Sequence, residues 1–298
     1  ITIVGQGAMG LLWYHQLAKD ASNQLSLVCS TRILSVPLDT HFTDIDNQVT
    51  SQPLIVANRA TLQNAELILV CVKSYQIAAV LRTLSKQFNA KATVIFCHNG
   101  MVDFNLFAAL KQPCYTLLTT HASKIIKSFH TQHTGLGHND IGLITGKIEL
   151  AAQEKVIAIL SKALPSLTLS ANIQQQQWQK LAINCVINPM TAIDNVDNGQ
   201  LLNDKYATVI DKVLAEVITV ARYENVEFDL SQLQKSVRKV AKQTEKNCSS
   251  MRSDILQQRK TEIDYINGYI VNLANKFGIA VPENEKLVQH VNALENEL

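Results

Sequence analysis

The sequence lacks the features by which several classes of protein are recognised. Lys and Arg (27) nearly balance Asp and Glu (25), which leaves a net charge of +2, and no basic block with interleaved aromatic residues occurs. This balance gives no general attraction to nucleic acid or to anionic membranes. The strongly apolar runs, such as residues 67–72, are far shorter than the roughly 20 residues that span a bilayer. No charged leader with a cleavage site is visible, so we expect no secretory signal.

Cysteine patterns that would indicate disulfides or a metal site are also missing. None of the six cysteines belongs to a C-x-x-C pair, and most lie in apolar runs. We therefore expect reduced core thiols in a cytoplasmic protein. With 298 residues, 47% of them hydrophobic, the chain can bury enough apolar surface for two packed domains.

The N-terminal stretch carries a dinucleotide-binding pattern. The β-branched run Ile1–Val4 leads directly into Gly5-Gln6-Gly7-Ala8-Met9-Gly10, and an apolar helical pattern continues to about Lys19. G-x-G-x-x-G between a strand and a helix is the context in which this motif binds dinucleotides. Gly5 permits the tight turn, Gly7 lets the backbone approach a pyrophosphate, and Gly10 lets helix and strand pack closely. The helix N-terminus offers N–H groups to the phosphates.

The end of the second expected strand bears on the choice of dinucleotide. Residues 25–29 are followed by Ser30-Thr31-Arg32, where an NAD-preferring site would have an Asp or Glu for the ribose hydroxyls. An arginine suits a 2′-phosphate because its planar fork matches phosphate oxygens. The pattern favours NADPH over NADH, and the alternative is an ordinary solvated arginine in a loop.

Two further strands end in polar residues. Lys73 follows the buried strand expected at 67–72, and His98-Asn99-Gly100 follows the strand expected at 93–97. Open α/β sheets bind ligands at the carboxyl ends of their strands. We expect Lys73 to contact the cofactor, and Asn99 to offer a donor and an acceptor to nicotinamide or substrate. His98 could be a general acid, although a histidine that points away from the site is the simpler interpretation.

The rest of the first half is expected to form further strands and helices. Residues 35–66 indicate a small antiparallel excursion, and residues 115–144 several short strands. His130 and His133 have H-x-x-H spacing, but on a strand the two rings would point to opposite faces, so we expect no metal site. A helix at about 151–163 and a strand at 166–169 complete this half.

After Ser170 the pattern becomes helical and glycine becomes sparse. The sequence therefore predicts an α/β protein: an N-terminal Rossmann-type dinucleotide-binding domain at 1–171, followed by an all-α C-terminal domain at 172–298. Helices are expected at about 203–224 and 230–247. Another is expected to begin at Asp254, which with Gln257 resembles a capping box, and to end near Lys276 before Gly278.

The first helix of this second half carries a polar stripe. Lys180, Asn184 and Asn188 recur every four residues, which aligns them on one helix face, and the other faces are apolar. A buried lysine is costly unless it is paired or used, and a cation with two amides suits a small substrate with a carbonyl and hydroxyls. The alternative is a lysine that reaches past an apolar helix to water. Pro189 should kink or stop this helix.

Glu262 lies on the helix expected from Asp254. A loop at 249–254 would allow Ser250 and Glu262 to converge on one small substrate, whereas a continuous helix would keep them apart. The alternative for Glu262 is a surface carboxylate paired with Arg259 or a lysine.

Together these segments resemble the ketopantoate reductase (2-dehydropantoate 2-reductase) family over essentially the whole chain. The resemblance rests on Gly5–Gly10, His98–Gly100, Lys180–Pro189, Ser249–Met251, Thr261–Gly268 and Gly278–Asn284. It implies NADPH-dependent reduction of a 2-keto acid to pantoate, on the route to pantothenate and coenzyme A.

The resemblance also implies a role for each site residue. Lys180 would be the general acid, and Glu262 would bind the substrate hydroxyl. Asn184 and Asn188 would contact the hydroxyl end of the substrate, Ser250 its carboxylate, and Asn99 the nicotinamide and reacting region. Arg32 and Lys73 would hold the 2′-phosphate. The turn around Arg32 is longer than in the family pattern, so Ser30 or Thr31 would share the phosphate.

Two competing functions follow from the same residues. A related dehydrogenase acting on another 2-keto or 3-hydroxy acid would share both domains, while a non-catalytic NADPH sensor would keep Gly5–Gly10 and lose Lys180. The lysine, asparagine and glutamate set favours ketopantoate. Monomer and homodimer both stay open, because a buried helix face and a dimer face look alike in sequence.

Overall fold

The computed structural model describes residues 1–30, 38–164 and 166–297. The chain divides into two compact units. Unit 1 comprises Ile1–His98 and Asp103–Ile173, and unit 2 comprises Asn99–Val102 and Gln174–Leu298. The short segment 99–102 therefore packs with residues that are far away in the sequence.

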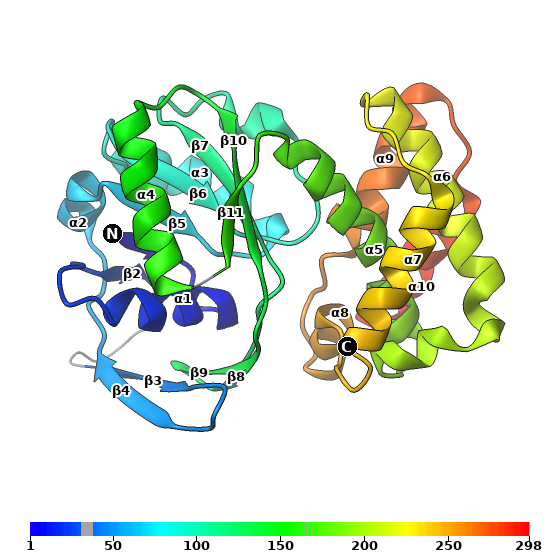
Figure 1. Ribbon diagram of the computed structural model, residues 1–298, viewed down its shortest axis with the longest axis horizontal. Helices are drawn as coiled ribbons and strands as arrows, with labels where there is room; N and C mark the ends of the chain where they lie inside the picture. Colours follow the sequence, from blue (N-terminus) through cyan, green and yellow to red (C-terminus); the bar gives the residue numbers. More distant parts are fainter. Residues whose placement is uncertain (31–37, 165, 298) are drawn as a thin grey trace. The chain divides into compact units, whose positions relative to one another are not determined.

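Unit 1 is built on a seven-stranded sheet with the order β11-β10-β7-β6-β5-β1-β2 (Figure 1). All neighbouring strands are parallel except β7 and β10, which are antiparallel. The central strands are buried, as expected for continuous apolar runs with both faces covered. The strands are β1 (Thr2–Val4), β2 (Ser26–Val28), β5 (Leu67–Val70), β6 (Thr93–Phe96), β7 (Cys114–Thr119), β10 (Asn139–Thr145) and β11 (Leu167–Leu169).

The order of the strands creates a switch point at β1. The chain runs from β1 through helix α1 (Ala8–Ala18) to β2 on one side, and β5 lies on the other side of β1. Val4 is in register with Val70 of β5, so Gly5 and Cys71 leave the sheet side by side. Ligands of open α/β sheets bind at such a point.

A second sheet covers the outer side of α1. Its order is β4-β3-β9-β8, from strands β3 (Asp39–Thr43), β4 (Val49–Pro53), β8 (Ala122–Lys127) and β9 (His130–Gly135). The antiparallel β3–β4 pair is the excursion expected between residues 35 and 66, and β3 also pairs in parallel with β9. Figure 1 shows α1 between the two sheets, and residues 10–17 of this helix are accordingly all buried.

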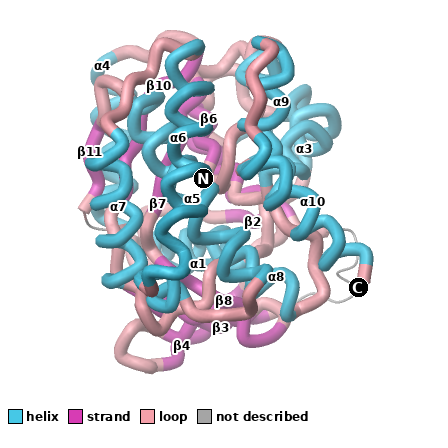
Figure 2. The backbone as a smooth tube through the Cα atoms, turned by 90° about the vertical axis from the view of Figure 1, so that its right-hand side faces the viewer, coloured by secondary structure: helices cyan, strands magenta, loops and turns pink. Residues whose placement is uncertain are grey.

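Unit 2 is helical. Figure 2 looks onto its helices, and among the described residues after α5 no strand occurs. The predicted fold class, an α/β N-terminal part followed by an all-α part, is confirmed. The helices are α5 (Ile173–Ile193), α6 (Ala207–Tyr223), α7 (Leu230–Gln243), α8 (Ser250–Leu256), α9 (Asn267–Phe277) and α10 (Pro282–Asn296). The described residues of unit 1 also form the α-helices α2 (Arg59–Asn64), α3 (Ile77–Leu84) and α4 (Leu150–Ala163).

The sequence predicted that Pro189 would kink or stop its helix, and it does not stop α5. The helix continues to Ile193 with the proline inside it. A proline lacks the N–H that would bond the carbonyl four residues earlier, here that of Cys185. The Asn267 side chain donates to this carbonyl instead, with Nδ2 2.9 Å from the oxygen.

The expected helix start at Asp254 is wrong. Ser249 caps α8, because its Oγ accepts from the Arg252 backbone N–H at 3.1 Å. Asp254 lies inside α8, where its carboxylate accepts two hydrogen bonds from the Arg259 guanidinium. The chain then leaves the helix, so Glu262 lies in a turn before the short 3₁₀ helix η6 (Ile263–Tyr265). The expected end of α9 is confirmed, because Gly278 follows Phe277 in the left-handed region.

The burial of α1 places a histidine inside unit 1. His15 is 5% exposed, its Nε2 lies 2.9 Å from Thr40 Oγ1, and its ring stacks on Phe42. Burial, and then the nearby rings of His41 and His130, lower the pKa of His15 to about 4. A neutral imidazole is therefore part of the folded structure at neutral pH.

This histidine should make stability depend on pH. An unfolded histidine binds a proton near pH 6.5, whereas folded His15 does so only near pH 4, so between these values the unfolded state holds more protons. The free energy of unfolding should therefore fall as the pH is lowered through this window, by up to about 3 kcal/mol from this group. His15→Gln keeps a hydrogen-bonding group for Thr40 and cannot titrate, so it should show a shallower fall. Urea unfolding at pH 7, 5.5 and 4.5, followed by Trp13 fluorescence in a Trp178→Phe background, measures the difference. Parallel curves for both proteins would contradict the assignment.

Candidate functional site

The loop after β1 has the shape that the glycine pattern predicts. Gly5 has φ +117°, and a Cβ there would lie 2.6 Å from the Cys71 carbonyl oxygen. A Cβ at Gly10 would lie 1.9 Å from the Gly5 carbonyl oxygen, so only glycine lets α1 start this close to β1. At Gly7, in contrast, a Cβ would meet no atom within 4 Å. Gly5 and Gly10 are needed for packing, whereas Gly7 borders open space in which a ligand could approach the backbone.

Gln6 connects this loop to the end of β2. Its Oε1 accepts from the Ser30 backbone N–H at 2.9 Å. Ala8 and Met9 are the first residues of α1, where helical N–H groups have no acceptor within the helix. Thr31 and Arg32 lie outside the described residues, so their role in phosphate recognition stays a prediction.

Lys73 lies just beyond the carboxyl end of β5. It is partly exposed, and its backbone N–H donates to Gln76 Oε1 at 3.1 Å, which forms the turn η1 (Ser74–Gln76). Because β1 and β5 are neighbours in the sheet, this turn and the glycine loop leave the same sheet edge side by side. The geometry is compatible with the expected cofactor contact.

Asn99 belongs to unit 2, although it follows a strand of unit 1. Gly100 has φ +71°, and a Cβ there would lie 2.3 Å from the Tyr265 carbonyl oxygen. The same oxygen accepts from the Met101 backbone N–H at 2.7 Å. This close backbone contact holds the segment 99–102 against η6, the short helix that directly follows Glu262. Nothing in the local pattern around Asn99 had indicated this packing.

The polar stripe on α5 lies on an otherwise buried helix. Lys180 and Asn184 are partly exposed and Asn188 is 6% exposed. Most of the apolar residues between them are buried, as the sequence predicted, and Ile183 is partly exposed. The buried ones are Leu181, Ala182, Cys185, Val186 and Ile187. Trp178, which precedes the stripe, is buried with its ring edge-on to Tyr269 of α9.

Glu262 is not a surface carboxylate. It is 3% exposed, and Arg259, its expected surface partner, bonds Asp254 instead. The turn around Glu262 is fixed on both sides: the Thr261 N–H donates to Glu295 of α10, and the Tyr265 N–H donates to the Glu262 carbonyl. A carboxylate buried in a fixed turn, in the same unit as Lys180, is a candidate for substrate recognition rather than for solubility.

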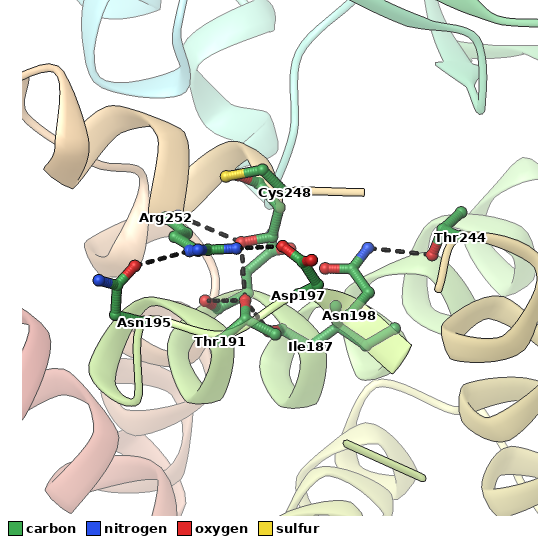
Figure 3. A network of polar contacts seen from close by, with 10 residues as sticks. Ile187, Thr191, Asn195, Asp197, Asn198, Thr244, Cys248 and Arg252 are labelled. Carbon is green, nitrogen blue, oxygen red and sulfur yellow. Dashed lines mark hydrogen bonds and ion pairs between the residues drawn. The ribbon is translucent and has the colours of Figure 1, made fainter. Parts of the chain in front are cut away.

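Ser250 is the first residue of α8 and is exposed. The neighbouring Ser249 Oγ lies 2.8 Å from Thr191 Oγ1 near the end of α5, and this hydrogen bond joins the two helices. Arg252 makes two more contacts, to Asn195 Oδ1 at 2.8 Å and to Asp197 Oδ1 at 2.5 Å (Figure 3). Sequence reasoning missed this network, and only Ser249, inside a recognised motif, gave any signal of it.

The histidines of the small sheet have separate partners. His130 Nε2 lies 2.8 Å from Thr43 Oγ1, whereas His133 Nε2 lies 3.1 Å from His121 Nδ1. Among the described residues no group of three or more His, Cys, Asp or Glu could hold a metal ion. Within the same residues, no helix has the length and apolar character to cross a membrane.

Comparisons with known proteins agree with the motifs. A model of the family described as "Ketopantoate reductase PanE/ApbA" matches residues 1–146, and the corresponding model of its C-terminal part matches residues 172–295. The 2-dehydropantoate 2-reductase of Vibrio cholerae is 33% identical over 300 residues, which cover 99% of this chain and 97% of that relative.

Solved structures share the fold over the full length. A PanE/ApbA family ketopantoate reductase from Ralstonia eutropha has a TM-score of 0.85 at 24% identity, covering 100% of this chain and 99% of that one. D-mandelate dehydrogenase, in a ternary structure with NADH and anilino(oxo)acetate, has a TM-score of 0.89 at 21% identity with the same coverage. The sequence matches over both units show that the chain belongs to the ketopantoate reductase PanE/ApbA family.

Proposed function

We propose that the protein reduces 2-dehydropantoate to pantoate with NADPH, in the synthesis of pantothenate and coenzyme A. The observation that carries this proposal is the 33% identity, over 99% of this chain, to a 2-dehydropantoate 2-reductase. The chain also has Lys180, both asparagines and a buried Glu262. The dinucleotide is assigned to residues 1–171 and the keto acid to residues 172–298, with Asn99 also serving the reacting region.

The residues of unit 1 fit a nicotinamide dinucleotide. Gly7 leaves room for a pyrophosphate beside the N-terminus of α1, whose unbonded N–H groups favour negative charge. When bound, the cofactor supplies a hydride to the ketone carbon. The preference for NADPH rests on Arg32 and Lys73 and on the lack of an acidic residue after β2. It needs its own measurement, because the structurally similar D-mandelate dehydrogenase contains NADH.

The residues of unit 2 suit the ketone end of the reaction. As the ketone is reduced, negative charge develops on its oxygen, and the Lys180 ammonium stabilises that charge and gives up a proton to it. Asn184 and Asn188, on the same face of α5, contact the hydroxyl end of the substrate. The Glu262 carboxylate accepts a hydrogen bond from the substrate hydroxyl, and the Ser250 hydroxyl donates one to the carboxylate of the substrate. A dehydrogenase for another 2-keto acid is the second candidate, favoured only by the fold likeness to D-mandelate dehydrogenase.

The first test is oxidation of NADPH in the presence of ketopantoate. We expect rapid turnover with NADPH and slower turnover with NADH. Lys180→Ala should lower kcat by roughly 10²- to 10⁴-fold, the range that a positioned general acid contributes, while NADPH still binds. Tight NADPH binding without turnover of ketopantoate would overturn the substrate assignment, and a panel of other 2-keto acids, including benzoylformate, would then identify the alternative.

The glycine loop provides a second test with a built-in control. Gly10→Ala places a Cβ against the Gly5 carbonyl oxygen, so it should lower the free energy of unfolding by about 1–3 kcal/mol or more. Gly7→Ala places its Cβ in open space, so it should leave stability unchanged and weaken dinucleotide binding. Thermal unfolding and NADPH titration by fluorescence measure both effects. Undiminished NADPH affinity in Gly7→Ala would argue against a pyrophosphate at this loop.

A further inference from the structure

A chain of polar contacts, buried at one end and partly buried at the other, begins at the proline in α5. Pro189 has no N–H, so the Cys185 carbonyl inside this buried helix lacks its usual helical donor. Asn267 Nδ2 lies 2.9 Å from this oxygen and donates to it. Leaving a buried carbonyl without a donor would cost the full desolvation of that group. The hydrogen bond from Asn267 therefore allows α5 to continue through Pro189.

The same nitrogen of the Asn267 side chain makes a second hydrogen bond. Asn267 is fully buried, and Nδ2 also lies 3.0 Å from Asn284 Oδ1. An amide nitrogen has two hydrogens, and these two contacts use both of them. Asn284 Nδ2 in turn donates to Glu216 Oε2 at 2.7 Å. Rotation of the Asn267 amide would break both of its donor bonds, so its position is fixed.

Glu216 anchors the far end of this chain. Its two carboxylate oxygens accept from the backbone N–H groups of Glu283 and Asn284, each at 2.9 Å. These groups belong to the first turn of α10, where helical N–H groups have no acceptor within the helix. The side chains of Asn267, Asn284 and Glu216 therefore link α9, α10 and α6, and Asn267 connects this chain of contacts to the backbone of α5.

The position of Asn267 connects this chain to the candidate site. Cys185 lies directly after Asn184 on α5, and Asn267 begins α9 at the end of the segment that carries Glu262. The Tyr265 carbonyl in the same segment holds the backbone of Met101, two residues after Asn99. Residues 262–267 thus contact two other parts of unit 2 that carry candidate site residues, α5 and the segment 99–102.

We propose that Asn267 is a positioning residue for the reaction: by donating to the carbonyl that Pro189 leaves open, it fixes the register of α5 against the Glu262 segment. The polar stripe of α5 and Glu262 then keep a set separation. Asn267 acts through Cys185 and does not itself touch the substrate. This inference rests on the proposed function of Lys180, Asn184 and Glu262.

The test is a double-mutant cycle between Asn267 and Pro189. Asn267→Ala removes the donor, and we expect kcat to fall by roughly ten- to a hundredfold, the effect of a shift of about 1 Å in a site. Pro189→Ala supplies a backbone N–H that can donate to the Cys185 carbonyl. In the Pro189→Ala background, the fold-decrease in kcat caused by Asn267→Ala should therefore be several times smaller than in the protein that keeps Pro189. NADPH affinity, measured by fluorescence titration, should stay within about twofold, since unit 1 is unchanged.

Val237→Ala is the matched control for a purely structural effect. Val237 is buried on α7, and its truncation should lower the melting temperature without changing the kcat of the folded enzyme. If Asn267→Ala behaves like this control, or loses the same factor of kcat in both Pro189 backgrounds, the positioning role is wrong. The melting temperatures of the single and double variants test the Asn267–Cys185 hydrogen bond independently of any substrate. If the two single substitutions change the melting temperature additively, this hydrogen bond is contradicted. Absence of ketopantoate turnover in the wild type would instead refute the proposed function.

Discussion

A helix buried on most sides can persist only if each of its backbone groups has a hydrogen-bond partner, and this requirement organises unit 2. The apolar faces of α5 lie in the core, and its stripe of Lys180, Asn184 and Asn188 runs along the remaining face. Pro189 interrupts the backbone ladder in the middle of that core. The partner that restores the missing bond comes from α9, so the shape of the helix depends on packing as much as on its own residues.

Unit 1 follows the same requirement in a different form. Its helix α1 is covered on two sides, by the large sheet and by the small sheet, and therefore has no solvated face. Thr40 provides a hydrogen-bond partner inside the unit for His15, a buried polar residue of this helix. The close approach of α1 to β1 is possible only because Gly10 lies against the Gly5 carbonyl, and the same packing aims the helix N-terminus toward the space beside Gly7.

The candidate substrate residues gather in unit 2 through contacts that join distant parts of the sequence. Asn99 comes from the end of a strand of unit 1, yet Gly100 and Met101 pack against the backbone of Tyr265. Glu262 is buried in the turn that precedes this tyrosine. The network from Thr191 through Ser249 fixes the start of α8, and with it Ser250. The proposed reaction uses each of these segments.

The sequence by itself determined what depends on neighbouring residues. The strand–glycine–helix pattern, the buried strands, the four-residue spacing on α5 and the end of α9 at Gly278 are local, and the α/β class followed from them. The tertiary structure alone decided that α5 passes Pro189, that Ser249 and not Asp254 caps α8, and that Glu262 lies in a buried turn. Cys185 and Asn267 are 82 residues apart, and Thr191 and Ser249 are 58 apart. A capping residue or a carbonyl acceptor has many possible partners within the chain, and only the packed core selects one of them.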